Sequence, residues 1–268
     1  MMAVVHMFAD AAVIAKRNMI KIKRVPEVLV FVLLSPIMFV LLFAYVFGGS
    51  ISIPGGSYRE FLIAGIFAQT VVFGSTFTGV GIADDIQKGI IDRFRSLPMS
   101  QAAVLIGRTA SDVVYNVLTL LIMALTGLVV GWRIHSSLWE GLVGFGLLLA
   151  FAYAFSWTMA LVGLLVPSVE VINIASFMVI FPVTFIANTF VPAENLPTVL
   201  RTFAEWNPIS SLTQAVRELF GNIPPGTPDP TAWPLQNPVI YTLIWAALII
   251  AVFAPLASLR YQKAVKQG

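Results

Sequence analysis

Apolar stretches long enough to cross a membrane recur along the whole chain. A helix needs roughly 20 apolar residues to span about 30 Å of hydrocarbon. Six stretches approach or exceed that length, at 28–48, 60–82, 104–131, 139–166, 171–191 and 238–259. Helices are favoured because each backbone group then finds its hydrogen bond within the segment. The pattern predicts an all-α membrane protein with six transmembrane helices in a single domain, residues 1–268.

The segment before the first span has the pattern of a helix that lies on a membrane surface. Between residues 4 and 24, apolar side chains recur at alternating spacings of three and four, and most of the charges fall on another face. The apolar face consists of Val5, Phe8, Ala12, Ala15, Met19 and Ile22. We predict an amphipathic interface helix, which either only anchors the chain to lipid or also contacts a cytoplasmic partner.

A charged stretch, residues 84–100, separates the second and third spans. It carries charges of both signs, and four apolar residues recur at helical spacing on one face, namely Ile86, Ile90, Phe94 and Leu97. Pro98 stops or kinks this helix before the third span. A short helix with one apolar face suits docking into a partner's groove. A solvated loop that only enforces topology is the alternative.

Between the fifth and sixth spans, two helical patterns are too short to cross the membrane. One includes Phe203 and the other Val216, and Asn207-Pro208 separates them. Their length predicts a re-entrant pair, residues 193–222, that caps the outer end of the bundle. Its charged side chains, which form either a solvated surface or part of the cap, include Glu194, Arg201, Glu205 and Arg217.

The distribution of Lys and Arg predicts the orientation of the chain. An even number of spans places both termini on one side, and 12 of the 16 Lys and Arg residues then share that side. The four exceptions are Arg59, Arg133, Arg201 and Arg217. Because cytoplasmic loops carry the excess of positive charge, we expect cytoplasmic N and C termini.

Composition narrows the function. The chain is 58% hydrophobic and 11% charged, whereas soluble domains average about 25% charged residues. The net charge of +3 is too small and scattered to indicate nucleic acid, and the absence of cysteine excludes a disulfide or thiolate site.

The sequence contains no G-x-x-x-x-G-K-[ST] phosphate loop. The chain is therefore not itself an ATPase of that kind, and its energy comes from another chain or from an ion gradient.

Few residues are candidates for catalysis. His6 and His135 are far apart and lack partners at ligand spacing, so we predict no metal site. Asp112 is the one acidic residue expected within a span, and such a residue is a hypothesis of function. Arg108 precedes it by four residues, which indicates a local ion pair; a role in transmitting motion is the alternative.

The order of these segments resembles the ABC-2 type permease family, and in particular its daunorubicin-resistance branch. In that family an acidic residue, a Gly, a Leu and a Pro precede the third span, and here the matching residues are Asp85, Gly89, Leu97 and Pro98. The string KGIIDRFRSLPMS resembles that branch. Family positions around the re-entrant segment fall on Phe190, Pro192, Pro197, Asn207, Pro208 and Arg217.

The resemblance implies a division of labour. Two copies of an ABC ATPase subunit would bind ATP and Mg²⁺ and drive two permeases, identical or related, that export amphipathic drugs or lipids across the bacterial inner membrane. This chain would then be no enzyme and would hold no cofactor of its own. An ion-coupled secondary transporter is the alternative, with a membrane enzyme or scaffold as a third possibility. Such carriers place several ionisable groups at mid-membrane, and these spans contain almost none.

The resemblance also implies three sets of functional residues. Coupling to the ATPase would involve Asp84, Asp85, Ile86, Gly89, Ile90, Arg93, Phe94, Arg95, Leu97 and Pro98. The substrate path would run past Phe39, Phe43, Phe73, Phe77, Phe181, Phe185 and Asn188. An extracellular gate would consist of Pro192, Glu194, Pro197, Asn207, Pro208 and Arg217.

Overall fold

The regular structure of this protein is helical wherever its placement is described. A computed structural model describes residues 10–20, 26–47, 57–91, 101–166, 168–193, 196–223 and 226–267, and no strand occurs within them. After a helix over residues 10–20 the elements are α2 (Pro26–Leu42), the π-helical η1 (Phe43–Phe47), α3 (Tyr58–Gly74), α4 (Thr76–Gln87), α6 (Gln101–Val130), α7 (Leu138–Leu165), α8 (Val169–Ile186), α9 (Thr198–Trp206), α10 (Pro208–Phe220), α11 (Trp233–Gln236) and α12 (Pro238–Gln267). The prediction of an all-α membrane fold is confirmed.

Among the described residues, five helical stretches are long and apolar enough to cross a membrane. They are Tyr58–Gln87, Ala103–Val130, Leu138–Leu165, Val169–Ile186 and Pro238–Gln262. A further apolar helical stretch, Leu34–Val46, is shorter. The first predicted span, 28–48, extends beyond the residues described.

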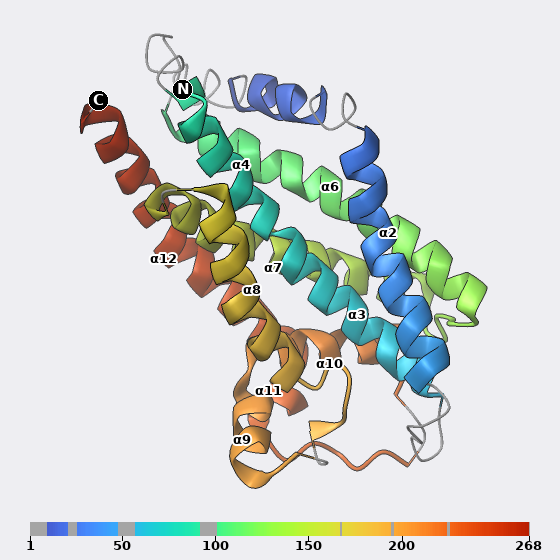
Figure 1. The fold of residues 1–268 in the computed structure, drawn as a ribbon. Coiled ribbons are helices and arrows are strands. Elements are labelled where there is room, and N and C mark those ends of the chain that lie inside the picture. Colours follow the sequence, from blue (N-terminus) through green and yellow to red (C-terminus); the bar gives the residue numbers. More distant parts are fainter. Residues whose placement is uncertain are drawn as a thin grey trace.

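The stretch that contains α3 and α4 is the central helix of the bundle. Its apolar window is 78% buried, against 22% in each of α8 and α12. In Figure 1 it runs between α2 and α8, with α7 behind it. Ser75 briefly interrupts it, and the Ser75 hydroxyl donates to the carbonyls of Val71 and of Ala152 in α7. The interruption is therefore fixed by a neighbouring span.

The two ends of the bundle are built differently (Figure 1). Helix 10–20 and the last turns of α12 lie at one end, which we call the terminal end. The short helices α9, α10 and α11 lie at the other, which we call the far end. The candidate functional residues described below lie at these two ends or in the bundle between them.

Several helix ends differ from the predicted boundaries. The central helix runs to Gln87, into the segment predicted to form a separate coupling helix. α8 ends at Ile186, five residues before the predicted end of the fifth span, and residues 187–191 form turns instead. Ala187 and Phe190 of this run are buried inside the protein, and a hydropathy pattern does not distinguish such burial from contact with lipid.

Helix 10–20 packs through a different face from the one we predicted. Ala11, Ile14 and Asn18 are buried, whereas Ala12 and Met19 on the predicted apolar face are exposed. The Asn18 amide donates to the Ser111 hydroxyl of α6 at 3.2 Å. That polar contact, together with the burial of Ala11 and Ile14, determines the packed face and leaves Met19 exposed.

Candidate functional site

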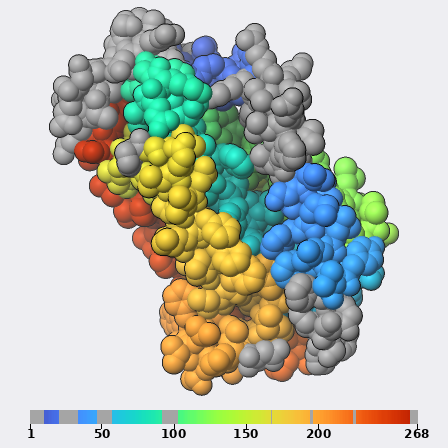
Figure 2. Space-filling model, viewed as in Figure 1, coloured from blue at the N-terminus to red at the C-terminus, as the bar shows by residue number. Residues whose placement is uncertain are grey.

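A cavity of about 490 Å³ opens between α2 and α8. Its floor is the central helix, and α6 closes one side. The space-filling view in Figure 2 shows the central helix recessed between α8 and α2. The lining residues are Ser35, Pro36, Phe39, Gln69, Thr70, Phe73, Gly74, Thr76, Phe77, Tyr115, Thr119, Phe177 and Phe181. The volume lies within the range of small-molecule sites, about 300–1,000 Å³.

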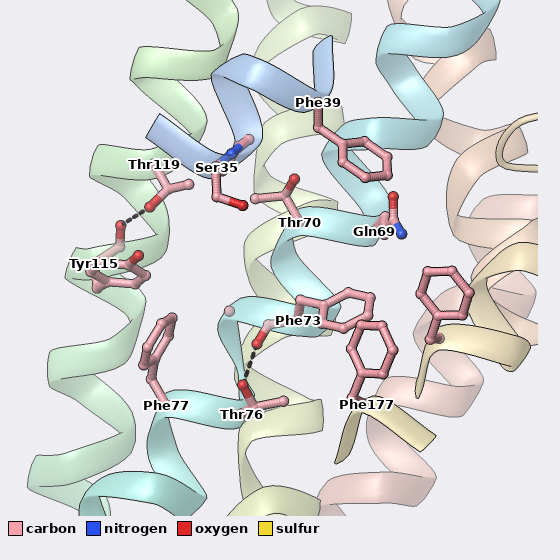
Figure 3. Close-up of a pocket in the computed structure, with 13 residues that line it drawn as sticks. Ser35, Phe39, Gln69, Thr70, Phe73, Thr76, Phe77, Tyr115, Thr119 and Phe177 are labelled. Carbon is pink, nitrogen blue, oxygen red and sulfur yellow. Dashed lines mark hydrogen bonds between the residues drawn. The ribbon is translucent and has the colours of Figure 1, made fainter. Parts of the chain in front are cut away.

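The cavity wall combines aromatic rings with uncharged polar groups (Figure 3). None of the lining residues carries a charge. Two of the hydroxyls are held by their own helices: Thr119 donates to the Tyr115 carbonyl at 3.0 Å and Thr76 to the Phe73 carbonyl at 2.7 Å. Gln69 adds an amide to the wall. Such a wall is suited to a neutral molecule with an aromatic or apolar body and a few polar groups.

A continuous row of phenylalanine rings begins at this cavity, passes through Phe190 after α8 and returns to the cavity at Phe39. Neighbouring ring centroids in the row are 4.3–4.9 Å apart, a spacing typical of favourable ring contacts. In order, the rings belong to Phe177, Phe181, Phe185, Phe190, Phe43 and Phe39. Because Phe190 follows α8 and is buried, the row joins α8 to the end of the first apolar helix.

The structure brings most of the predicted path residues together. Phe39, Phe73, Phe77 and Phe181 line the cavity; Phe43 and Phe185 belong to the row. Asn188 lies elsewhere, under Arg217. The sequence reasoning missed Phe177, Tyr115 and Gln69. Phe177 belongs to the same predicted span as Phe181 and Phe185 and precedes Phe181 by one helical turn, so the criterion that selected those two aromatic residues would also have included it.

Arg217 is a buried residue at the far end, only 2% exposed. Its Nε donates to the Phe61 carbonyl at 3.0 Å, and Nη2 donates to the carbonyls of Asn188 and Thr189 at 2.7 and 3.2 Å. Arg217 therefore joins α10, the central helix and the turn after α8. The alternative of a solvated surface is wrong for this residue.

The turn after α8 also rests directly on the backbone of the central helix. A Cβ atom added to Gly65 would lie 2.1 Å from the Thr189 carbonyl oxygen, closer than real Cβ contacts. Any side chain here would push the turn away, so only glycine permits this approach.

Asn207 holds α10 against α8. Its Oδ1 accepts from the Ile209 amide at 2.9 Å, which caps α10, and its Nδ2 donates to the Val183 carbonyl at 2.8 Å. Pro208 occupies the first turn of α10, where its missing amide proton costs nothing. Of the other predicted gate residues, Pro197 precedes α9 and Pro192 is half-buried. Glu194 lies outside the described residues.

At the terminal end, Asp85 faces the protein. Its Oδ2 lies 2.6 Å from Arg17 Nη2 of helix 10–20, and it is buried. Asp84 instead pairs with Lys88 on the surface at 2.7 Å. Both acidic residues are predicted to contact the ATPase, and Asp85 in fact links helix 10–20 to α4.

The predicted continuous helix through residues 84–100 is interrupted. α4 ends at Gln87, and Gly89 has a φ of 63°, the left-handed conformation common just after a helix. Ile86 and Ile90 therefore do not share one uninterrupted helix face, as we had expected. The remaining predicted coupling residues, Arg93, Phe94, Arg95, Leu97 and Pro98, lie outside the described residues.

The predicted ion pair within the third span is present. Arg108 Nε lies 3.6 Å from Asp112 Oδ2, and the Thr78 hydroxyl donates to the same carboxylate. Arg108 Nη2 donates to the Phe77 carbonyl at 2.6 Å. Because Phe77 lines the cavity, this buried pair directly supports the cavity wall.

Several helices long enough to span a membrane, with an uncharged cavity between them, indicate a multipass membrane protein. Comparison with known proteins agrees: residues 10–220 match the ABC-2 type transporter family, and the chain belongs to that family. It is therefore a transport component rather than an enzyme.

Three relatives illustrate the similarity. The chain is 34% identical over 247 residues to the daunorubicin resistance ABC transporter permease protein DrrB1 of Streptomyces coeruleorubidus, covering 92% of this chain and 83% of the relative. It is 24% identical to the probable doxorubicin resistance ABC transporter permease protein DrrC of Mycobacterium tuberculosis, covering 72% and 66%. It is also 24% identical to the putative transport permease ycf38 of Cyanophora paradoxa, covering 78% and 73%.

Proposed function

We propose that this chain is the membrane subunit of an ATP-driven exporter for amphipathic molecules, either aromatic drugs or lipids. The observation that carries the proposal is the uncharged, aromatic cavity in the bundle of an ABC-2 family chain. The names of two relatives concern daunorubicin and doxorubicin resistance, which favours drugs. An ion-coupled carrier is less well supported, since the family is one of ABC transporters and the cavity wall holds no ionisable pair that faces it.

The proposed complex contains two copies of an ABC ATPase subunit, which bind ATP and Mg²⁺, and a second permease copy, identical or related. The absence of a phosphate loop in this chain supports a separate ATPase. The exposure of α2 and α8 on either side of the cavity, at Met38 and Met178 for example, supports a second permease there. Such a copy would close the open side of the cavity.

The proposed orientation places the terminal end in the cytoplasm of a bacterial inner membrane and the far end outside. Residues 84–100 and helix 10–20 would then receive motion from the ATPase, and Arg17–Asp85 would pass it to the central helix. Arg217 and Asn207 would hold the extracellular gate. The distribution of Lys and Arg supports this orientation.

Transport by the reconstituted complex tests the cavity. The measurement is ATP-dependent uptake of doxorubicin into inside-out vesicles that contain this chain and its ATPase. Phe73→Ala and Gln69→Leu change the cavity wall and should each reduce uptake several-fold. Phe253→Ala makes the same aromatic truncation in α12, away from the cavity, and is the matched control. Equal uptake by all variants at equal expression would remove the cavity from the proposal.

Association with the ATPase tests the coupling segment. Truncation of a central apolar anchor at a protein interface costs about 2 kcal/mol or more, whereas rim charges cost little. Phe94→Ala should therefore weaken co-purification of the ATPase and abolish substrate-stimulated hydrolysis, while Lys88→Ala should change neither. Wild-type behaviour of Phe94→Ala would show that the segment does not dock the ATPase.

A further inference from the structure

The short helix α9 presents an apolar face that no described part of the protein covers. Val199, Phe203 and Trp206 follow one another at spacings of four and three, and are 82%, 50% and 55% exposed. Ala204, on another side of the helix, is completely buried. Arg201 and Glu205 of α9 form an ion pair, with Arg201 Nε 2.8 Å from Glu205 Oε1. This pair lies on the side of the helix opposite the apolar face. α9 thus rests on the protein by one side and leaves its apolar side outward.

This face continues into the surface of a membrane span. The Tyr241 ring, in the first turn of α12, lies 6.5 Å from the Trp206 ring and 6.0 Å from the Trp233 ring. The Tyr241 hydroxyl donates to the Trp206 carbonyl at 2.9 Å. Next to Tyr241, Ile240 is exposed on the outer surface of α12. The α9 face is therefore fixed at the level where α12 begins.

The chemistry at this level is that of a bilayer interface. Trp and Tyr concentrate where the hydrocarbon meets the headgroups, because each ring has an apolar body and a polar edge. A helix with one apolar face and one polar face lies in that same layer. The next helix along the chain, α10, behaves differently, since most of its residues are buried in the protein.

From these observations we propose that α9 is a lipid-binding helix. Its Val199–Phe203–Trp206 face rests among the headgroups and upper acyl chains of the leaflet at the far end, while α10 stays within the protein. The two short helices predicted as one re-entrant pair thereby have different surroundings. A second protein chain is a poorer occupant, because the face meets the start of an apolar span at Tyr241 and carries a Trp ring there, as expected at a bilayer interface.

The absence of cysteine from the sequence makes a direct test possible. Single variants Val199→Cys, Phe203→Cys and Thr198→Cys each receive a nitroxide label, in the complete transporter reconstituted in phosphatidylethanolamine and phosphatidylglycerol vesicles. Thr198 is the matched control because it is also exposed but lies on the side of α9 that carries Arg201 and Glu205, three and seven residues further along. Collision rates with oxygen, which partitions into lipid, and with a water-soluble nickel complex then report the surroundings of each label.

We expect the ratio of oxygen to nickel collisions to be several-fold higher at positions 199 and 203 than at 198. Nickel collisions as frequent at 199 and 203 as at 198 would overturn the proposal in favour of a solvated face. Low collision rates with both reagents at 199 and 203 would overturn it in favour of burial against another chain. The measurement needs no transport, so its outcome is independent of the drug and the ATPase proposed above.

Discussion

The guanidinium carbon of Arg217 lies 3.4 Å from the centroid of the Phe61 ring, and Nε of the same guanidinium donates to the Phe61 carbonyl. One residue of the central helix thus receives both a cation–π contact and a hydrogen bond from α10. Nη2 of Arg217 also donates to the Asn188 carbonyl in the turn after α8. A single side chain therefore holds α10, the central helix and this turn together at the far end.

Loss of this side chain should destabilise the far end. Arg217→Met removes donors from three buried carbonyls, and an unsatisfied buried group costs about 1–3 kcal/mol. Arg217→Lys keeps the charge but not the planar fork, so we expect it to recover only part of the loss. The measurement is the unfolding midpoint of the purified protein in detergent. The control is Arg201→Met, whose i,i+4 pair is partly exposed and contributes about 0.5 kcal/mol; equal effects at both positions would contradict the assignment.

A double-mutant cycle on Arg17 and Asp85 tests the link between helix 10–20 and α4. The Asp85 side chain is almost fully buried and the Arg17 side chain about one third exposed. The free energy of unfolding is measured for Arg17→Gln, for Asp85→Asn and for the double variant. We expect a coupling energy of about 1 kcal/mol or more between the two substitutions, at or above the upper end of the range for exposed pairs. The exposed pair of Lys88 and Asp84, changed in the same way, should show a smaller coupling energy because solvent screens it. Additive effects at Arg17 and Asp85 would show that the contact contributes nothing.

Gly89 should tolerate asparagine better than alanine. A Cβ atom there meets nothing within 4 Å, so the only obstacle is the φ of 63°. A left-handed conformation costs an alanine roughly 1 kcal/mol, and asparagine less. Unfolding midpoints of Gly89→Ala and Gly89→Asn measure the difference. If alanine is the milder substitution, the turn after α4 does not have the conformation described.

Labelling of single cysteines tests the orientation. Asp229→Cys lies in an exposed far-end loop and should react with a membrane-impermeant maleimide in intact cells, as should Ser52→Cys. Gln267→Cys, at the end of α12, should react only after permeabilisation. Both expectations follow from the excess of Lys and Arg at the terminal end. Labelling of Gln267→Cys in intact cells would reverse the orientation.

The sequence was sufficient for the class of fold because lipid imposes a strong length requirement on each apolar run. It was not sufficient for the ends of those runs: residues 187–190 are buried inside the protein, where Arg217 binds the carbonyls of Asn188 and Thr189. Helix 10–20 shows the same limit, because its packed face depends on one hydrogen bond from Asn18 to a residue 93 positions away.

The residues of the cavity were partly predictable from the sequence, whereas the contacts of Arg217 at the far end were not. The family resemblance led to Phe181 and Phe185 as aromatic residues of the fifth span, and one further helical turn reaches Phe177. The partners of Arg217 are backbone carbonyls, and the Phe61 carbonyl belongs to a residue 156 positions away. Every residue type carries a carbonyl, so no pattern of side chains indicates which ones will meet an arginine.

The contact between Gly65 and Thr189 has a mechanical consequence. Where side chains separate two helices, a small displacement can be absorbed by a change of rotamer. Here the carbonyl of Thr189 meets the main chain of the central helix itself, and no torsion between the two segments is free to turn. The turn after α8 and the far-end half of the central helix must therefore be displaced as one rigid body.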